Sequence, residues 1–180
     1  AFLIGEGEEA IVEIGQTIQK WRQSGAYLNG GEPPGRQRRI DLLRQLALLD
    51  GVYVPQFYDV EYHTDGTLAQ VSSAEEAARQ PVLKRIVKKL PPPLTNFIVP
   101  SVDVVHNRAV IEIMRGCTRG CRFCHAGMVT RPVRERTVPE IIAAVGSMIT
   151  ATGYEELALL SLSSSDYRDI GQLVGAISAE

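Results

Sequence analysis

Cysteine is scarce in this chain of 180 residues, and all three cysteines fall within residues 117–124. Three thiols, an odd number, argue against a closed disulfide framework, and a reducing cytoplasm is the expected compartment. The longest apolar runs, such as "LALL" and "AVIEI", are far below the roughly 18 residues of a membrane-spanning helix. No secretion signal opens the chain. A net charge of −2 provides no overall attraction to nucleic acid or an anionic membrane, and we expect no membrane partner.

The composition that remains, 44% hydrophobic and 22% charged, is typical of a globular protein. An apolar strand at 2–4 precedes a helix that ends near residue 25, and a second helix covers 40–49. "FYDVEY" and "TLAQV" flank an Asp-Gly turn and predict a hairpin. "PVLKRIVKKL", at 81–90, predicts a short basic amphipathic helix that ends at the prolines 91–93.

The last third of the chain has the most regular pattern. "RAVIEIM", at 108–114, predicts a buried strand. Thr137 and Glu140 form a capping-box pair for a helix that extends to about residue 151. "ELALLSL" predicts a parallel strand covered on both faces, and Ser165 or Asp166 could cap the helix that follows. This alternation of strands and helices is typical of an α/β parallel sheet or barrel.

The cysteines are spaced C-x3-C-x2-C, which leaves three interpretations. They could be three small buried hydrophobic residues, although arginines and glycines surround them. They could bind zinc with His125 as the fourth ligand, although adjacent Cys124 and His125 would have difficulty reaching one ion. They could bind an iron–sulfur cluster. Cluster irons are normally held by four cysteines, so three cysteines would leave one iron open to a small molecule.

The cysteine spacing, with Phe123 directly before Cys124 and a strand before the loop, resembles the signature of the radical S-adenosylmethionine (radical SAM) enzymes. The resemblance implies that the loop joins the first strand of a full or partial TIM-type barrel to its first helix, at the end where barrel active sites lie. It implies that Cys117, Cys121 and Cys124 bind three irons of a 4Fe–4S cluster, while the fourth iron binds S-adenosylmethionine. An electron from the reduced cluster would then produce methionine and a 5′-deoxyadenosyl radical for C–H chemistry.

The resemblance also assigns further contacts to S-adenosylmethionine. The backbone at Phe123 would lie near the adenine. The family often has a Gly-Gly-Glu-Pro-like segment after its second strand, which contacts the amino group of S-adenosylmethionine, and this chain has "SLSSSDY" there. The hydroxyls that could replace that segment are those of Ser161, Ser163, Ser164 and Ser165; alternatively these serines form only a strand end and a helix cap. The run Gly30 to Pro33 has the family's letters but lies in a predicted linker, and we interpret it as a coincidence.

Longer stretches, including "GVYVPQFYDV" and "PSVDVVHNRAVIEIM", resemble a radical SAM branch with an N-terminal cobalamin-binding-like domain, which makes cobalamin a candidate cofactor. We therefore expect an α/β chain that is an internal fragment of a longer protein. Residues 1–25 would end a Rossmann-like cobalamin-binding domain, 26–107 would form an α+β linker region with short helices and a hairpin, and 108–180 would hold the first two βα units of the barrel.

Six arginines lie between residues 115 and 136, against the single acidic residue Glu135. Their charge could support an anionic cluster and attract an acidic electron donor such as flavodoxin or ferredoxin. The alternatives are an exposed basic face or an RNA-binding patch, so RNA and protein substrates both stay open. A metal-binding interaction module without turnover, holding zinc or an iron–sulfur cluster, is the alternative to an enzyme.

Overall fold

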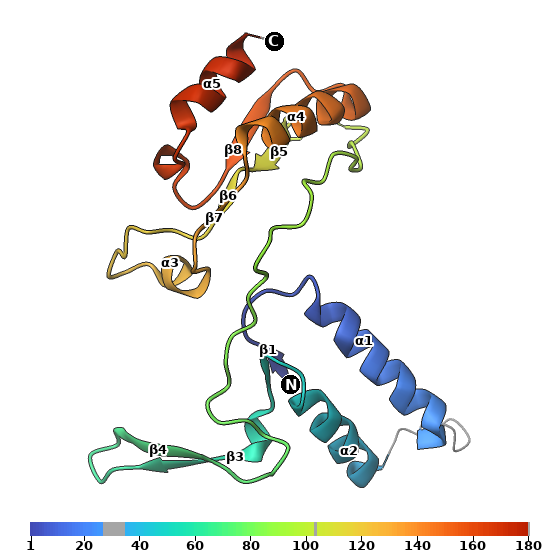
Figure 1. The fold of residues 1–180 in the computed structure, drawn as a ribbon. Helices are drawn as coiled ribbons and strands as arrows, with labels where there is room; N and C mark the ends of the chain where they lie inside the picture. The colour runs from blue at the N-terminus through green and yellow to red at the C-terminus, as the bar shows by residue number, and fades with distance from the viewer. Residues whose placement is uncertain (27–34, 103, 180) are drawn as a thin grey trace. The chain divides into compact units, whose positions relative to one another are not determined.

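The computed structural model describes residues 1–26, 35–102 and 104–179, and Figure 1 shows its helices and strands. The chain divides into two compact units, Ala1–Val87 and Lys88–Glu180, and both mix helices with strands. The mixed α/β class is therefore confirmed. Among the described helices, none is both long and apolar enough to cross a membrane. The run from Gly30 to Pro33 lies outside the described residues.

The first unit packs two helices beside a short strand pair. Its main elements are α1 (Ala10–Trp21), the π-helical turn η1 (Arg22–Ala26), α2 (Arg36–Ala47), and the antiparallel pair β1 (Phe2–Leu3) and β2 (Val52–Tyr53). A 3-10 turn, η2 (Pro55–Phe57), follows β2. The core is small because these elements are short; it consists of Leu46, Ala47, Val52, Val54, Phe57 and Ala78.

The predicted hairpin of the first unit is confirmed. Strands β3 (Tyr58–Tyr62) and β4 (Leu68–Ser73) pair antiparallel. In the turn, the Asp65 carboxylate accepts hydrogen bonds from the backbone N–H and the hydroxyl of Thr67, at 2.9 and 2.6 Å. Gly66 adopts φ +83°, a conformation that glycine reaches without steric cost. The Asp-Gly pair that predicted the turn therefore also forms it in the structure.

The helix predicted for residues 81–90 is wrong, because this segment is extended in the structure. The backbone N–H of Arg85 donates to the carbonyl of Ile4 at 2.8 Å, and the carbonyl of Arg85 accepts from the N–H of Glu6 at 3.1 Å. The Arg85 side chain also pairs with Glu9 and Glu13. These contacts with the N-terminal segment satisfy the backbone groups that a helix would have used internally.

The second unit contains a parallel strand pair joined by a helix, as the sequence predicted. Strands β5 (Ala109–Glu112) and β8 (Leu157–Leu160) are parallel neighbours, with Ile111 opposite Leu159. Helices α4 (Val138–Thr152) and α5 (Ile170–Ser178) complete the unit. One face of the strand pair packs on the helices, and the core consists of Ala109, Ile111, Ile113, Met114, Val138, Ile141, Ala144, Val145, Met148, Tyr167 and Leu173.

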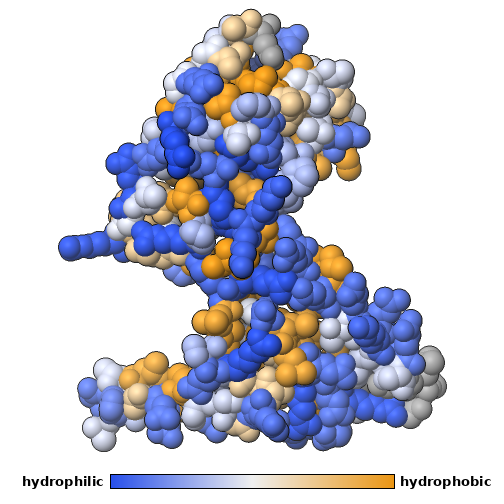
Figure 2. Space-filling model, in the orientation of Figure 1, coloured by the Kyte–Doolittle hydropathy of each residue, from blue (hydrophilic) through white to orange (hydrophobic). Residues whose placement is uncertain are grey.

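The other face of this strand pair is open, so the predicted cover on both faces is wrong for the described residues. Val110 and Leu160 on that face are 41% and 54% exposed. They border a cavity of about 260 Å³ that residues 91–94 also line. In Figure 2, orange hydrophobic residues interrupt the mostly blue surface of each unit.

Two predicted helix caps differ in detail from the structure. The Thr137 hydroxyl accepts from the N–H of Glu140 at 3.4 Å, whereas the Glu140 carboxylate turns to Arg136, so only half of the capping box forms. Neither Ser165 nor Asp166 caps α5. They lie in the 3-10 turn η3 (Ser164–Asp166), and Asp169 precedes α5 without a side-chain cap. The Asp166 carboxylate has other partners, described below.

Candidate cofactor site

The cysteines lie on a loop, residues 116–133 (the cysteine loop), whose two ends are held together by a short ladder. Strand β6 (Met114–Arg115) enters the loop and pairs antiparallel with β7 (Arg134–Glu135), which leaves it. Gly116 follows β6 with φ +93°, and a Cβ there would lie 2.7 Å from the carbonyl oxygen of Pro132. Only glycine permits this close approach, which closes the base of the loop.

Within the loop, the three thiols differ in exposure and in hydrogen bonding. Cys117 is buried, Cys124 is half-buried and Cys121 is exposed. The backbone N–H of Arg119 donates to the Cys117 sulfur at 3.4 Å. The N–H of Gly127 donates to the Cys124 sulfur at 3.3 Å, which makes Cys124 the N-terminal cap of the short helix α3 (His125–Val129). Sequence reasoning missed this capping role.

These observations fit the chemistry of an iron–sulfur ligand set. Three thiols on one loop are the ligand type that cluster irons prefer, and backbone N–H groups directed at sulfur tune such clusters. In the described part of the chain, no three Cys, His, Asp or Glu side chains come together as a metal site. Binding a cluster would therefore require the three thiols to come closer together than they lie in this structure.

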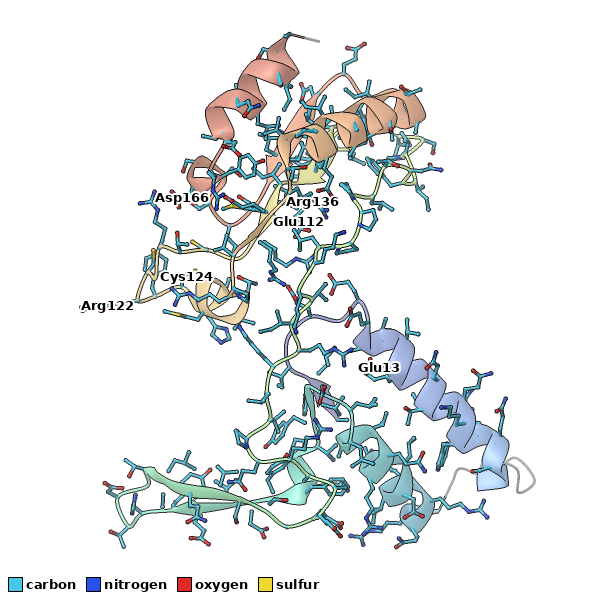
Figure 3. The ribbon with its side chains drawn as sticks, in the orientation of Figure 1. Glu13, Glu112, Arg122, Cys124, Arg136 and Asp166 are labelled. Atoms are coloured by element: carbon cyan, nitrogen blue, oxygen red, sulfur yellow. The ribbon has the colours of Figure 1, made fainter. Side chains whose placement is uncertain are left out.

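Two of the arginines on and beside the loop, Arg115 and Arg119, form ion pairs with carboxylates. Arg115 donates to the Glu112 carboxylate at 2.9 and 3.1 Å. Arg119 donates to both carboxylate oxygens of Asp166, with its Nε atom 2.6 Å from Oδ2. Arg122 makes no hydrogen bond or ion pair with the described residues, and Figure 3 shows it extending outward from the loop. The prediction that these arginines support an anionic cluster stays a prediction, although Arg115 and Arg119 already have carboxylate partners.

Another arginine of this group, Arg136, is the one buried charged residue in the described part of the chain, at 5% exposure. It donates to the carbonyl of Glu112 and to the Glu140 carboxylate, both at 2.8 Å, and its guanidinium lies 3.7 Å from the Glu112 carboxylate. Arg136 and Glu112 lie side by side in Figure 3. Such pairing is what makes burial of a charge tolerable, and it fixes the end of β5 where the loop begins.

The serines that follow β8 bond mainly to one another. The Ser161 and Ser164 hydroxyl oxygens are 2.9 Å apart, and the Ser161 oxygen accepts from the N–H of Ser163 at 3.1 Å. The Ser163 hydroxyl donates to Asp166 at 2.7 Å. Ser165 is exposed. The structure therefore gathers Ser161, Ser163 and Ser164 at the carboxyl end of β8.

Asp166 and Tyr167 connect this serine turn to the loop and to the core. The hydrogen bonds from Arg119 and then Ser163 lower the pKa of the Asp166 carboxyl. Tyr167 is 2% exposed, and its hydroxyl donates to the carbonyl of Arg136 at 2.8 Å. Burial raises the pKa of this phenol. Tyr167 thus attaches the turn to the core of the second unit, while the Asp166 carboxylate binds Arg119 of the cysteine loop.

A polar cavity of about 690 Å³ lies beside the base of the loop. It is bordered by the start of α4 at Thr137 and the start of α5 at Asp169, and by Thr118 from the loop and Asp166 from η3.

Residues 111–180 match the model of the Radical SAM superfamily. Among curated proteins, the chain is 33% identical over 63 residues to a tRNA-2-methylthio-N(6)-dimethylallyladenosine synthase of Solibacter usitatus, covering 35% of this chain and 14% of that protein. It is 31% identical over 62 residues to the ribosomal protein uS12 methylthiotransferase RimO of Desulfotalea psychrophila, covering 34% of this chain and 14% of that protein. The chain thus spans about one seventh of the length of these relatives.

A different match covers more of the chain at lower identity. An acetaldehyde dehydrogenase 3 of Nocardia farcinica is 29% identical over 120 residues, which is 66% of this chain and 36% of that protein. Its name describes another chemistry, and this level of identity and coverage shows no family. No solved structure matches the chain.

The superfamily match covers the segment that contains all three cysteines, and it agrees with the resemblance of this segment to radical SAM enzymes. The match to that superfamily implies a 4Fe–4S cluster and S-adenosylmethionine as cofactors.

Proposed function

We propose that Cys117, Cys121 and Cys124 hold a 4Fe–4S cluster and that the chain takes part in the reductive cleavage of S-adenosylmethionine for C–H chemistry. The observation that carries this proposal is the loop itself: three thiols between two ends of one ladder, at the carboxyl end of β5. When bound, a reduced cluster supplies the electron that cleaves the sulfonium into methionine and a 5′-deoxyadenosyl radical.

The chain's own residues would position these groups. Backbone at Phe123, whose side chain is 91% exposed, would lie near the adenine, and the hydroxyls of Ser161, Ser163, Ser164 and Ser165 would serve the amino group. Ser161 and Ser164 would have to exchange their mutual hydrogen bond for a bond to the ligand. Arg122, which has no ion pair among the described residues, would attract an acidic electron donor such as flavodoxin or ferredoxin.

The parallel pair β5 and β8, joined through α4, supports the start of a TIM-type barrel from residue 108 onward. By the same resemblance, residues 1–25 would end a cobalamin-binding-like domain, and 26–107 would be the linker region. The methylthiotransferase relatives match only a segment of about sixty residues. They support the cofactor chemistry, including sulfur insertion or methyl transfer as possible net reactions, and leave the substrate open.

Anaerobic reconstitution tests the cluster assignment. We expect about four irons and four sulfides per chain, and loss of both when Cys117, Cys121 and Cys124 are changed together to Ala. His125→Ala is the matched control, since it alters the neighbouring residue and should keep the full iron content.

The same preparation separates the competing interpretations. A colourless protein that binds zinc, and loses it in His125→Ala, would overturn the proposal in favour of a zinc site. For a loaded protein, addition of S-adenosylmethionine should change the electron paramagnetic resonance spectrum of the reduced cluster, because one iron is open to the ligand. An unchanged spectrum, together with no 5′-deoxyadenosine under reducing conditions, would contradict the proposed chemistry.

A further inference from the structure

The side chain of Arg119 joins two segments that are 47 residues apart in the sequence. Its guanidinium donates to both oxygens of the Asp166 carboxylate, the two-pronged geometry that gives arginine–carboxylate pairs their directionality. Arg119 lies between Cys117 and Cys121, and its backbone N–H also donates to the Cys117 sulfur. One residue therefore contacts a thiol through its main chain and the end of β8 through its side chain.

Asp166 is the fixed partner of this pair. Its side chain is 17% exposed, whereas that of Arg119 is 62% exposed. The Ser163 hydroxyl donates to the Asp166 carboxylate, and the N–H of Asp166 donates to the carbonyl of Ser163 at 3.0 Å. The next residue, Tyr167, belongs to the core of the second unit. The position of the carboxylate is thus set by the packed part of the unit, and Figure 3 shows Asp166 on the side of η3 that faces the loop.

We propose that Asp166 is a positioning residue for the cysteine loop: it holds Arg119, and through it the segment between Cys117 and Cys121, at the carboxyl end of β8. The importance of this segment to a cluster rests on the function proposed above. The pair also neutralises Arg119, so its contribution is the placement of the first two thiols and not a net positive charge. Partly exposed pairs contribute little to global stability, so the effect should be local.

Hydrogen exchange of the cluster-free chain tests this placement without any cofactor. Asp166→Ala and Arg119→Gln should each speed exchange in peptides from residues 117–121 by roughly two- to fivefold, because each removes a contact that holds this segment. The effects of the two changes should not add in the double variant, which should exchange no faster than either single variant, because both changes remove the same contact. The matched controls are Asp169→Ala and Arg122→Gln, which remove the same charges without removing a contact to the loop, and they should leave these peptides unchanged.

Cluster loading then connects the placement to function. Asp166→Ala should slow the uptake of iron and sulfide relative to Asp169→Ala, while the thermal midpoint of the two variants stays the same. Unchanged exchange in Asp166→Ala, or additive effects in the double variant, would overturn the inference even if the wild-type chain loads a full cluster. Faster exchange in a chain that takes up no cluster would instead overturn the proposed function and leave the contact between Asp166 and the loop established.

Discussion

In each unit, two segments of the backbone cross closely at a glycine, at Gly5 in the first and at Gly116 in the second, and the two crossings differ in what they close. In the first unit, the backbone at Arg85 passes so close to Gly5 that an added Cβ would lie 2.2 Å from the Arg85 carbonyl oxygen. In the second unit, Gly116 meets the backbone at Pro132 in the same way. Main-chain hydrogen bonds and ion pairs of Arg85 stabilise the first crossing. The second closes only the base of a loop whose far end, at Phe123, stays exposed.

The comparison shows that the same feature, a close approach of two backbone segments at a glycine, serves two purposes. At Gly5 the crossing joins the N-terminal segment to residues 85–87 and completes a fold. At Gly116 it brings two chain ends together and leaves the residues between them available to a ligand. Disrupting the first should therefore unfold a unit, whereas disrupting the second should disturb a site.

The largest effect is expected for Gly5→Val, because a side chain there combines a backbone clash with a φ of +106°. We expect the first unit to lose at least about 3 kcal/mol of unfolding free energy. The only tryptophan of the chain, Trp21, lies buried in this unit, so its fluorescence in a denaturant titration reports the loss. Gly15→Ala is the control. It lies in α1 with open space around an added Cβ and should stabilise by about 0.5–1 kcal/mol. A Gly5→Val chain as stable as the wild type would remove the first half of the comparison.

Gly116→Ala should chiefly impair the site. The added Cβ meets the carbonyl oxygens of Pro132 and Thr130 at 2.7 and 3.0 Å, which concentrates about 1–3 kcal/mol of strain at the loop base. We expect a clear fall in iron and sulfide bound after reconstitution. Gly120→Ala, at φ +65°, meets only the movable end of the Arg131 side chain at 3.3 Å and should lose less. Equal loading in the two variants would show that the loop base is not needed.

Arg85→Gln should lower the stability of the first unit by about 1 kcal/mol at neutral pH, a modest figure because Glu13 is 38% exposed. The hydrogen bond from Arg85 lowers the pKa of Glu13. This contribution is therefore present above the ordinary glutamate pKa and is lost as the pH falls through the lowered one. The wild type and the variant should converge in acid when Trp21 fluorescence is followed at both pH values. A difference that persists in acid would mean that Arg85 acts through packing instead.

The last pair of variants tests single hydrogen bonds, and Tyr167→Phe removes the bond to the Arg136 carbonyl while it keeps the ring. A buried hydrogen bond of this kind contributes about 1 kcal/mol, measurable as faster amide exchange in α4 and β7. Tyr58→Phe is the counterpart in the first unit, where the exposed hydroxyl donates to the Arg79 carbonyl at 2.6 Å; it should cost less. A larger loss at Tyr58 would contradict the burial argument.

Local signals in the sequence predicted much of the second unit. The apolar strand at 108–114, Thr137 as a helix cap and the apolar run before Ser161 each act within a few residues, and β5, α4 and β8 formed where these signals lie. The cysteine spacing is equally local, and the superfamily match covers it. Such features depend on neighbours along the chain, which is why a single sequence displays them.

The features that the sequence did not predict depend on distant partners. Residues 81–90 have a helical apolar pattern, but the backbone of Arg85 forms hydrogen bonds with Ile4 and Glu6 instead of bonds within a helix. Asp166 has the residue type of a helix cap, yet a guanidinium 47 residues away holds its carboxylate. Arg136 looked like one more surface cation, and only the fold reveals that Glu112 and Glu140 permit its burial. Their charges were visible in the sequence, but their pairing was not.

The short ladder between β6 and β7 has a consequence for how this site could change over generations or be redesigned. Because Met114 stands opposite Glu135 and Arg115 opposite Arg134, the two ends of the cysteine loop are fixed by residues outside it. The sequence between them can then vary in length and composition without shifting the strands beneath, since closing a somewhat longer loop adds little entropy cost. The cysteine loop could therefore be exchanged as a unit while β6 and β7 stay in place. A loop from another protein with the same three-thiol spacing could be grafted between Gly116 and Val133.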